Sequence, residues 1–258
     1  MHYAIPITQK LRKLVRSLNQ KQNRDQNHLF LAEGEKLCGE AYKSDFQVEL
    51  LVVRDSPAAE VLEIVDNFAD EGIPIYNAPK HQFDQMATTK SPQGIVSVIT
   101  KKELPITPNE NVVILDGVND PGNLGTIIRT AEWFGFKQVI IGSDSADHFN
   151  PKAVRSSMGA IFRMPVKSYD DLAEEVKENF GEIELFGATL DNKKYMIDSK
   201  PKGKFGLVFG SESHGISKDL IAQLTSNYTI KGIGDTESLN VAIAAGVSFN
   251  HFSQFIKN

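Results

Sequence analysis

The sequence contains one cysteine, Cys38, one tryptophan and no long apolar run. A single cysteine excludes an intramolecular disulfide and fits a reducing compartment, so we expect a cytoplasmic protein. No run approaches the roughly 18 apolar residues that span a membrane, and the N-terminus lacks the apolar stretch of a signal peptide. We therefore expect neither a membrane partner nor export.

Acidic residues are missing from positions 1–24, although the whole chain is acidic, with a formal net charge of −5. Six of the 28 basic residues lie in this segment, and the other 22 are outnumbered by 33 acidic residues. Apolar residues recur at positions 11, 14, 15 and 18, a spacing that predicts an amphipathic helix. A basic helix can neutralise phosphates of a nucleic acid, and the alternative is a solvated helix face.

Several common site motifs are absent. Residues 117–122 have glycines at P-loop spacing, but the Lys-Ser/Thr that should follow is Asn-Leu, and the G-x-G-x-x-G fingerprint is missing there, which disfavours a nucleotide enzyme. Residues 213–215 resemble part of a nucleophile elbow, yet Ser211 stands where a hydrolase needs glycine. The histidines are scattered, with no metal-binding spacing, so we expect no metal.

Predicted strands and helices alternate in the C-terminal part of the chain. The strands are near 112–116, 138–142, 183–188, 206–210 and 227–230, and the helices near 123–135, 169–180, 217–224 and 238–256. This alternation predicts an α/β fold with a mostly parallel sheet and helices on both faces. The last helix is apolar nearly all round, so it must be buried in its own domain or against a second subunit.

The N-terminal part has the pattern of a smaller α/β domain. Its predicted strands are 48–53, 73–76 and 94–99, and its helices lie near 42 and over 57–70. Two prolines and little periodicity mark a linker after it. We therefore expect a domain over residues 1–100, a linker over 101–110 and a second domain over 111–258.

Glycine follows or ends several predicted strands of the second domain, at positions 117, 142, 187, 210 and 232. Ligands bind at the carboxyl ends of strands in open parallel sheets, and glycine lets the backbone approach a ligand closely. A small-molecule site is therefore expected at this edge of the sheet.

The densest segment runs from a strand through Pro121-Gly122 into a helix. Asn123 is the expected N-cap of this helix, and Arg129 follows six residues later. The amide at the helix start can hold a guanidinium in place, and Arg suits phosphate geometry, so Arg129 is a candidate phosphate ligand. A surface arginine in an ion pair is the alternative.

Two further segments carry polar residues near predicted strand ends. Glu212 follows a strand and is either an acceptor for ligand donors above the sheet or a loop carboxylate in water. Ser238 and Asn240 lie at the start of the apolar last helix, where capping explains one polar residue but not two.

Taken in order, these segments resemble the SpoU (TrmH-like) family of RNA ribose 2'-O-methyltransferases, in the SPOUT superfamily. The family motif Asn-x-Gly-x3-Arg matches residues 123–129, Phe/Met-Gly-x-Glu followed by Gly matches 209–215, and Ser-Leu-Asn-Val matches 238–241. Residues 153–160 resemble a further family segment. Residues 1–100 are similar to the ribosomal-protein L30-like substrate-binding domain of many members.

The resemblance implies a C-terminal trefoil knot, S-adenosylmethionine as cofactor, and a homodimer packed through the knotted region. The family often has Ile-Pro-Met-x-Gly where this chain has Ile-Lys-Gly-Ile-Gly at 230–234, so a softer loop is expected. The implied cofactor-binding residues are Thr189, Phe209, Gly210, Ser211, Ile230, Gly232 and Leu239. The implied catalytic residues are Asn123, Arg129, Glu212, Ser238 and Asn240.

Methyl transfer to a ribose hydroxyl requires in-line alignment and removal of a proton. We assign Arg129 to the substrate phosphate and ribose hydroxyl, with Asn123 orienting it. The family's proposed base is this arginine, although a guanidinium hardly ever loses its proton. RNA contacts are expected on the basic helix and at Arg129, Lys152 and Arg155.

A substrate domain of this size favours ribosomal RNA as the partner. The alternatives are a transfer RNA 2'-O-methyltransferase and a methylation-inactive RNA-binding protein on the same fold.

Overall fold

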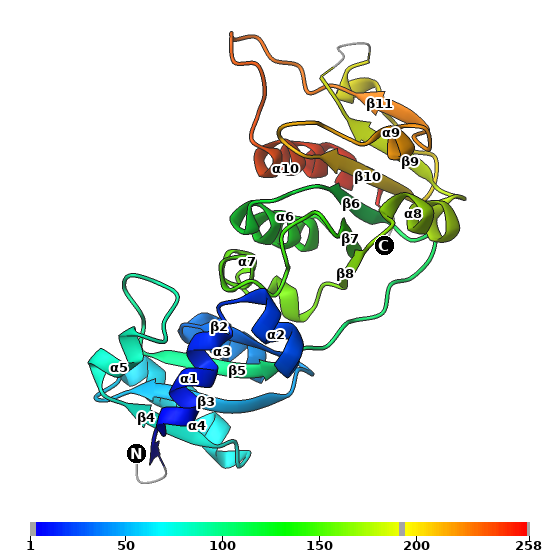
Figure 1. Ribbon diagram of the computed structural model, residues 1–258. Coiled ribbons are helices and arrows are strands. Elements are labelled where there is room, and N and C mark those ends of the chain that lie inside the picture. Colours follow the sequence, from blue (N-terminus) through cyan, green and yellow to red (C-terminus); the bar gives the residue numbers. More distant parts are fainter. Residues whose placement is uncertain (1–3, 191–193, 257–258) are drawn as a thin grey trace. The chain divides into compact units, whose positions relative to one another are not determined.

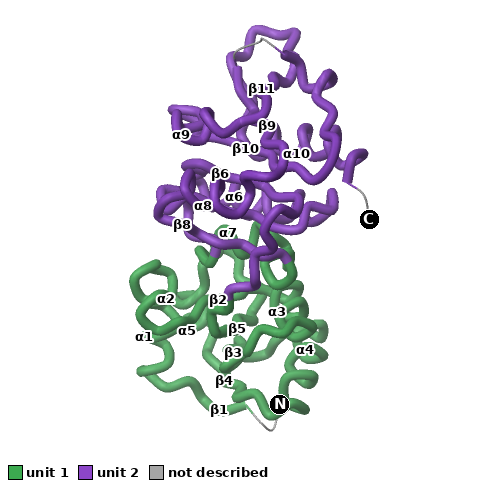
Figure 2. Tube along the Cα trace, turned by 90° about the vertical axis from the view of Figure 1, so that its right-hand side faces the viewer, with its two compact units in different colours: residues 1–102, 149–163 green, residues 103–148, 164–258 purple. Residues whose placement is uncertain are grey.

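The computed structural model of the chain describes residues 4–190 and 194–256. Contacts divide it into two compact units: unit 1 comprises residues 1–102 and 149–163, and unit 2 comprises residues 103–148 and 164–258 (Figure 2). Residues 149–163 fall outside the first domain expected from the sequence. They pack on unit 1 through aromatic rings, because the centroid of Phe149 lies 4.6 Å and that of Phe162 lies 6.2 Å from Phe30.

Unit 1 contains a mixed five-stranded sheet (Figure 1). β3 pairs with β4 and β4 with β1 in parallel, while β5 runs antiparallel to β2 and β3. In spatial order the strands are β1 (Ile5–Pro6), β4 (Ile75–Ala78), β3 (Val48–Arg54), β5 (Ile95–Thr100) and β2 (Leu29–Glu33). The strands predicted at 48–53, 73–76 and 94–99 are confirmed within two residues.

Helices cover both faces of this sheet. The predicted basic helix is α1 (Gln9–Ser17), and its N-cap Thr8 accepts a hydrogen bond from the Leu11 backbone N–H. Val15 and Leu18 are fully buried against the sheet, so this segment is part of the core and not a free arm. The other helices of unit 1 are α2 (Lys21–Asn27), α3 (Glu35–Tyr42), α4 (Ala59–Asp70), α5 (Lys80–Asp84), α7 (Pro151–Ser157) and a 3-10 turn at Ala160–Phe162.

The loop between α5 and β5 is held by the buried carboxylate of Glu33. This carboxylate accepts hydrogen bonds from the Thr88 backbone N–H at 2.7 Å and the Thr89 hydroxyl at 2.5 Å. Arg155 donates to the Thr88 hydroxyl at 3.1 Å and is half-buried. One nitrogen of its guanidinium is thus engaged within unit 1, and the RNA contact expected at Arg155 stays a prediction.

Unit 2 contains a six-stranded sheet in which every pair is parallel, as predicted. Its strands, in spatial order, are β11 (Ser226–Tyr228), β9 (Glu184–Ala188), β10 (Phe205–Gly210), β6 (Val112–Asp116), β7 (Gln138–Gly142) and β8 (Val166–Tyr169). The sequence did not indicate β8. The helix expected from residue 169 begins instead at Leu172, where Asp171 caps the backbone N–H of Glu174.

Successive side chains of a strand point to opposite faces of the sheet, so the apolar strands of unit 2 provide a hydrophobic core on each face. Val112 and Ile114 of β6 pack with α8 (Leu172–Phe180) and α9 (Lys218–Ile221). The opposite face carries α6 (Pro121–Trp133) and α10 (Val241–Phe252) (Figure 1). There Phe249 of α10 packs against Phe136 and Phe209, with centroids 4.8 Å and 5.7 Å away.

The last helix is shorter than predicted, and its own unit covers one side of it. It begins at Val241, and a 3-10 turn at Ser253–Phe255 follows it. Its inner face is buried, but Ile243 and Val247 on the outer face are 56% and 39% exposed. Burial within its own unit therefore accounts for only one side of this helix. No helix in the described part of the chain is long and apolar enough to cross a membrane.

Candidate active site

Two glycines shape the backbone at the carboxyl ends of β6 and β10, which are neighbours in the sheet of unit 2. Gly117 follows β6 with a φ of 77°, a backbone conformation that residues other than glycine rarely adopt. Gly210 ends β10, and a Cβ atom there would lie 2.0 Å from the backbone carbon of Gly215. Glycine at 210 is therefore required by close packing of two backbone segments.

The loop after β10 is a tight turn with Glu212 in it. Ser211 and Gly215 exchange backbone hydrogen bonds of 3.1 Å and 2.9 Å, and the Ser211 hydroxyl accepts from the His214 N–H at 3.0 Å. The loop is tied to β6 because the Ser217 N–H donates to the Asp116 carboxylate at 2.6 Å. These bonds fix the backbone on both sides of an exposed carboxylate.

The N-cap of α6 is Asp120, which corrects the expectation that Asn123 caps this helix. The Asp120 carboxylate accepts from the Asn123 backbone N–H at 2.9 Å, and Pro121 occupies the first turn. Capping by Asp120 leaves the Asn123 side chain available for other partners.

Three side chains from distant parts of the sequence form one hydrogen-bonded network, hereafter the amide–carboxylate network. The Asn123 and Asn240 amides each donate to Glu212 Oε1 at 3.2 Å. Asn240 also lies within 3.2 Å of the Asn123 carbonyl oxygen. The structure therefore brings together three of the five predicted catalytic residues, one from each motif.

Asn240 also begins α10. Its carbonyl oxygen accepts from the Ala242 N–H at 2.9 Å, so its side chain caps the helix and joins the network at once. Ser238 lies two residues before the N-cap, which corrects its placement on the first helical turn. It is exposed and makes no hydrogen bond within the described part of the chain.

Arg129 lies past the middle of α6 with its side chain exposed. The Asn123 amide bonds to Glu212, so it does not hold this guanidinium as expected. Among the described residues, Arg129 forms no hydrogen bond or ion pair. Its guanidinium is therefore accessible to a ligand or to solvent and is not part of the network.

The predicted cofactor-binding residues lie at the same edge of the sheet or on segments that leave it. Thr189 follows β9, and its carbonyl accepts from the Thr229 hydroxyl at 2.9 Å, beside Ile230. Phe209 is buried with its ring in the core, so only its backbone is available. Ser211 supports the Glu212 turn, while Gly232 and Leu239 lie on an exposed loop over residues 231–240.

The residues present suit S-adenosylmethionine in charge and in their place in the fold. The backbone groups that follow β6 and β10 lie at the carboxyl ends of parallel strands, where ligands bind in open α/β sheets. Asp116 and Glu212 supply negative charge suited to a sulfonium. Ile233 and Leu239, which are 96% and 48% exposed, offer apolar surface to an adenine ring.

Sequence reasoning missed the residues that support this edge. The Ser145 hydroxyl accepts from the backbone N–H groups of Gly117 and Val118 at 3.2 Å and 3.1 Å, and no sequence pattern signals it. Asp120 before Pro121 was recognisable as a helix start. The described residues contain no group of three or more His, Cys, Asp or Glu side chains arranged to hold a metal ion.

Comparison with known proteins shows the family. The SpoU rRNA methylase family model matches residues 110–250, and the MRM3-like substrate binding domain model matches residues 10–97. A curated relative, the 23S rRNA (guanosine(2553)-2'-O)-methyltransferase RlmP of Bacillus subtilis, is 32% identical over 92% of this chain and 93% of that protein.

Solved structures extend the likeness over nearly the whole chain. An RNA methyltransferase of the TrmH family from Porphyromonas gingivalis is 32% identical, with a TM-score of 0.82 over 95% of this chain and 98% of that one. An AdoMet-bound rRNA methyltransferase from Sinorhizobium meliloti is 26% identical, with a TM-score of 0.85 over 99% of this chain and 98% of that one.

The parallel α/β sheet, together with the family match and these relatives, identifies the chain as an S-adenosylmethionine-dependent RNA methyltransferase. The chain belongs to the SpoU rRNA methylase family, as its three motifs predict.

Proposed function

We propose that this chain methylates a ribose 2'-hydroxyl in 23S ribosomal RNA, with a guanosine as the candidate nucleotide. The protein is an S-adenosylmethionine-dependent RNA 2'-O-methyltransferase of the SpoU family. The choice of 23S RNA and of guanosine rests on the Bacillus subtilis relative, which carries both in its name.

The observation that carries the proposal is the amide–carboxylate network. Residues 123, 212 and 240 come from three separate motifs, yet their side chains lie within 3.2 Å of one another. This arrangement favours an active enzyme over the methylation-inactive alternative, because it fixes polar groups where substrate and cofactor would be positioned.

Bound S-adenosylmethionine supplies an electrophilic methyl group on a sulfonium. In the proposed arrangement the two amides orient Glu212, and Glu212 holds the substrate and the cofactor in position. Arg129 projects from α6 and binds the RNA phosphate next to the target ribose. Positioning by these groups accounts for most of the rate enhancement, because the oxygen, methyl and sulfur must lie in line.

We assign the remaining residues roles that follow the family motifs. Thr189, Phe209, Gly210, Ser211, Ile230, Gly232 and Leu239 contact the cofactor, mainly through backbone groups, and Ser238 contacts the substrate. Along the sequence we propose an L30-like RNA-binding domain over residues 1–100, a linker over 101–110 and a methyltransferase domain over 111–258, whose segment 149–163 packs on unit 1. The match of residues 10–97 to a substrate binding domain supports that role.

We also propose a C-terminal trefoil knot, a homodimer and a cytoplasmic location. The dimer is supported by exposed apolar side chains where α6 and α10 meet: Gly246 of α10 lies against Thr130 of α6, and Trp133, one turn further along α6, is 85% exposed. The knot is supported by family membership.

The test is to map 2'-O-methyl groups on total RNA from cells with and without the gene. We expect one modification in 23S ribosomal RNA to disappear with the gene and return with the wild-type copy. Loss of a site in transfer RNA, or of no site at all, would contradict the proposal.

A further inference from the structure

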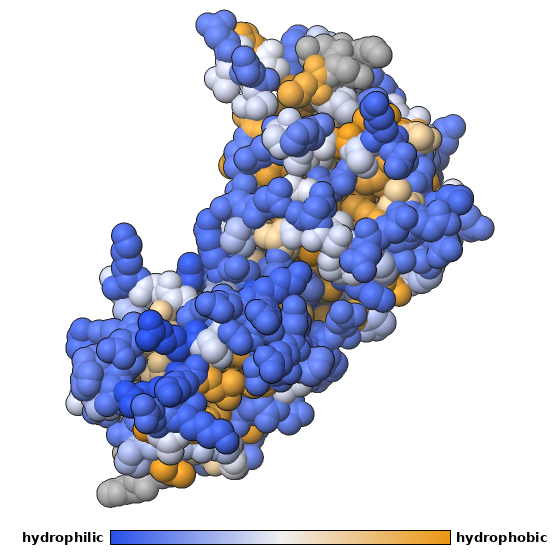
Figure 3. Space-filling view, in the orientation of Figure 1, coloured by the Kyte–Doolittle hydropathy of each residue, from blue (hydrophilic) through white to orange (hydrophobic). Residues whose placement is uncertain are grey.

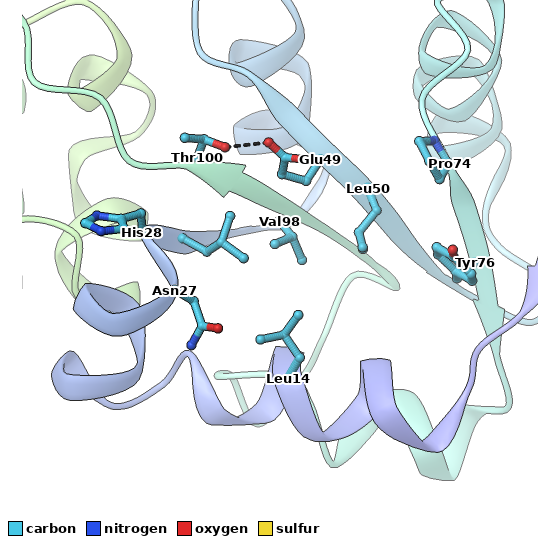
Figure 4. Close-up of a pocket in the computed structure, with 10 residues that line it drawn as sticks. Leu14, Asn27, His28, Glu49, Leu50, Pro74, Tyr76, Val98 and Thr100 are labelled. Carbon is cyan, nitrogen blue, oxygen red and sulfur yellow. Dashed lines mark hydrogen bonds between the residues drawn. The ribbon is translucent and has the colours of Figure 1, made fainter.

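Unit 1 has a groove of about 490 Å³ between α1 and the sheet, lined by residues of unit 1 alone. This volume falls within the range of about 300–1,000 Å³ found for small-molecule sites. Leu14 of α1 faces Leu50 and Val98 of the sheet across it (Figure 4). Figure 3 shows apolar surface within hydrophilic surroundings on the face of unit 1 that carries α1.

A β-bulge places a carboxylate in this apolar groove. The register between β3 and β5 shifts between Val48 and Leu50, so Glu49 is the extra residue. Consecutive strand residues normally point to opposite faces, but Glu49 and Leu50 both line the groove. Glu49 Oε1 accepts from the Thr100 hydroxyl at 2.5 Å, which fixes the carboxylate and leaves its other oxygen available (Figure 4).

A second acceptor stands at the end of the groove where α2 meets β2. The Asn27 amide nitrogen donates to the Asn23 carbonyl at 2.8 Å, so its carbonyl oxygen remains available. His28 follows with a φ of 54°, a left-handed conformation that places its exposed ring at the groove. With Tyr76 at the other end, the groove has rings for stacking and acceptors for hydrogen bonds.

Two lysines lie near Leu14 on the surface of α1. Lys10 lies one helical turn before Leu14 and therefore on the same face of α1, and Lys13 lies beside them. Both lysines are exposed and, within the described residues, neither forms an ion pair. Phosphates on either side of a base in the groove would meet these charges.

We propose that this groove binds an unpaired guanine of the substrate RNA. The inference rests on the proposed activity on RNA. Unpaired bases are recognised by stacking on aromatic or histidine rings and by hydrogen bonds to their Watson–Crick edge. Guanine alone presents a ring N–H and an amino group side by side, which suits a carboxylate. The other three bases place an acceptor on that edge beside each donor.

The test uses the full-length, isotope-labelled chain with saturating S-adenosylmethionine, which fills the proposed cofactor site, so that binding in unit 1 is read from the signals of unit 1 alone. GMP, AMP, CMP and UMP are titrated separately, and amide shifts are followed by NMR. We expect GMP to shift the signals of residues 27–28, 49–50 and 98–100, with roughly tenfold tighter binding than UMP, the scale of one charged hydrogen bond.

Two variants sharpen the test. Glu49→Gln keeps the side-chain shape but removes the charge, and it should abolish the GMP preference. His28→Gly suits the left-handed backbone and should weaken GMP binding without unfolding. Ser56→Gly, at another left-handed position of unit 1 outside the groove, is the matched control and should bind GMP normally.

Equal shifts with all four nucleotides, or no shifts in the groove, would overturn the guanine site. So would a GMP preference that survives in Glu49→Gln. A parallel assay of methyl transfer to 23S RNA separates the two proposals. Transfer without groove binding overturns only the guanine site, whereas absent transfer overturns the proposed function.

Discussion

At the scale of single residues, the network around Glu212 joins the three motifs. The two amides donate to one carboxylate oxygen, and the carboxylate is exposed, so its removal should change the site more than the fold. We expect Glu212→Ala to lower kcat by roughly 10²–10³-fold, the effect of losing one preorganised polar group in other enzymes. The melting temperature should hardly change.

The control for this prediction is Glu178→Ala, which removes an exposed carboxylate from α8. Both variants should be assayed with saturating RNA and S-adenosylmethionine. Equal activity in Glu212→Ala and the control would remove Glu212 from the catalytic site.

Cys38 should be unreactive in the folded protein. It is fully buried, and burial raises the pKa of its thiol from 9.0 to about 12. The thiolate is the reactive form, and a shift of this size lowers its fraction by roughly a thousandfold below pH 9. We expect a thiol-specific reagent at pH 8 to label the denatured chain quickly and the native chain slowly.

The same shift gives a pH dependence of stability. The neutral thiol is favoured in the folded state, so this contribution is fully present below pH 9 and is lost as pH rises from 9 towards 12. A Cys38→Ala variant should lose less stability over this interval than the wild type, as measured by urea unfolding. Parallel losses in the two proteins would show that Cys38 does not contribute.

At the scale of elements, a variant that disrupts the contact between the end of β10 and the following turn tests the candidate site. A Cβ at position 210 would lie 2.0 Å from the Gly215 backbone, which cannot move easily. We expect Gly210→Ala to cost about 1–3 kcal/mol of stability and to abolish measurable cofactor binding. Gly203→Ala, where a Cβ meets nothing within 4 Å, is the matched control and should behave as wild type.

The basic helix α1 offers a second prediction at this scale. Its apolar residues belong to the core, so deletion of residues 1–24 would unfold unit 1 and would not test RNA binding. Neutralising Lys10, Lys13 and Arg16 to glutamine should leave the fold intact. Each lost phosphate contact should flatten the slope of log affinity against log salt by about 0.7–0.9.

Lys36→Gln with Lys43→Gln, two exposed lysines at α3, provides the control for charge alone. If both sets of variants change the salt dependence equally, α1 has no special role in RNA binding.

The sequence predicted regular elements well where periodicity was strong, as in α1, α4 and the central strands of unit 2. It missed β8, because a four-residue strand directly before a helix has little pattern of its own. Local reasoning also placed Asn123 at a helix cap, since it could not weigh Asp120 against it. The hydrogen bonds of the amide–carboxylate network join residues that are 89 and 117 positions apart in the sequence, so no local pattern could predict them. Only the motif resemblance placed these residues in one site.

At the scale of the whole molecule, the exposed apolar face of α6 and α10 leads to the prediction of a dimer. Trp133, Ile243 and Val247 are exposed on helices that otherwise bury apolar residues. We expect light scattering after size exclusion to give the mass of two 28.6 kDa chains. Trp133→Glu should give one chain, while Ile197→Glu, an exposed apolar site elsewhere in unit 2, should remain a dimer.

The most direct test of the central claim is transfer of labelled methyl from S-adenosylmethionine to 23S ribosomal RNA by the purified chain. A methyl on the ribose oxygen blocks alkaline cleavage of the next phosphodiester, so we predict label in an alkali-resistant dinucleotide. Gly203→Ala should retain this transfer, Gly210→Ala should not, and Glu212→Ala should transfer roughly 10²–10³-fold more slowly. Label in alkali-sensitive mononucleotides, or no transfer by the well-folded wild type, would contradict the account.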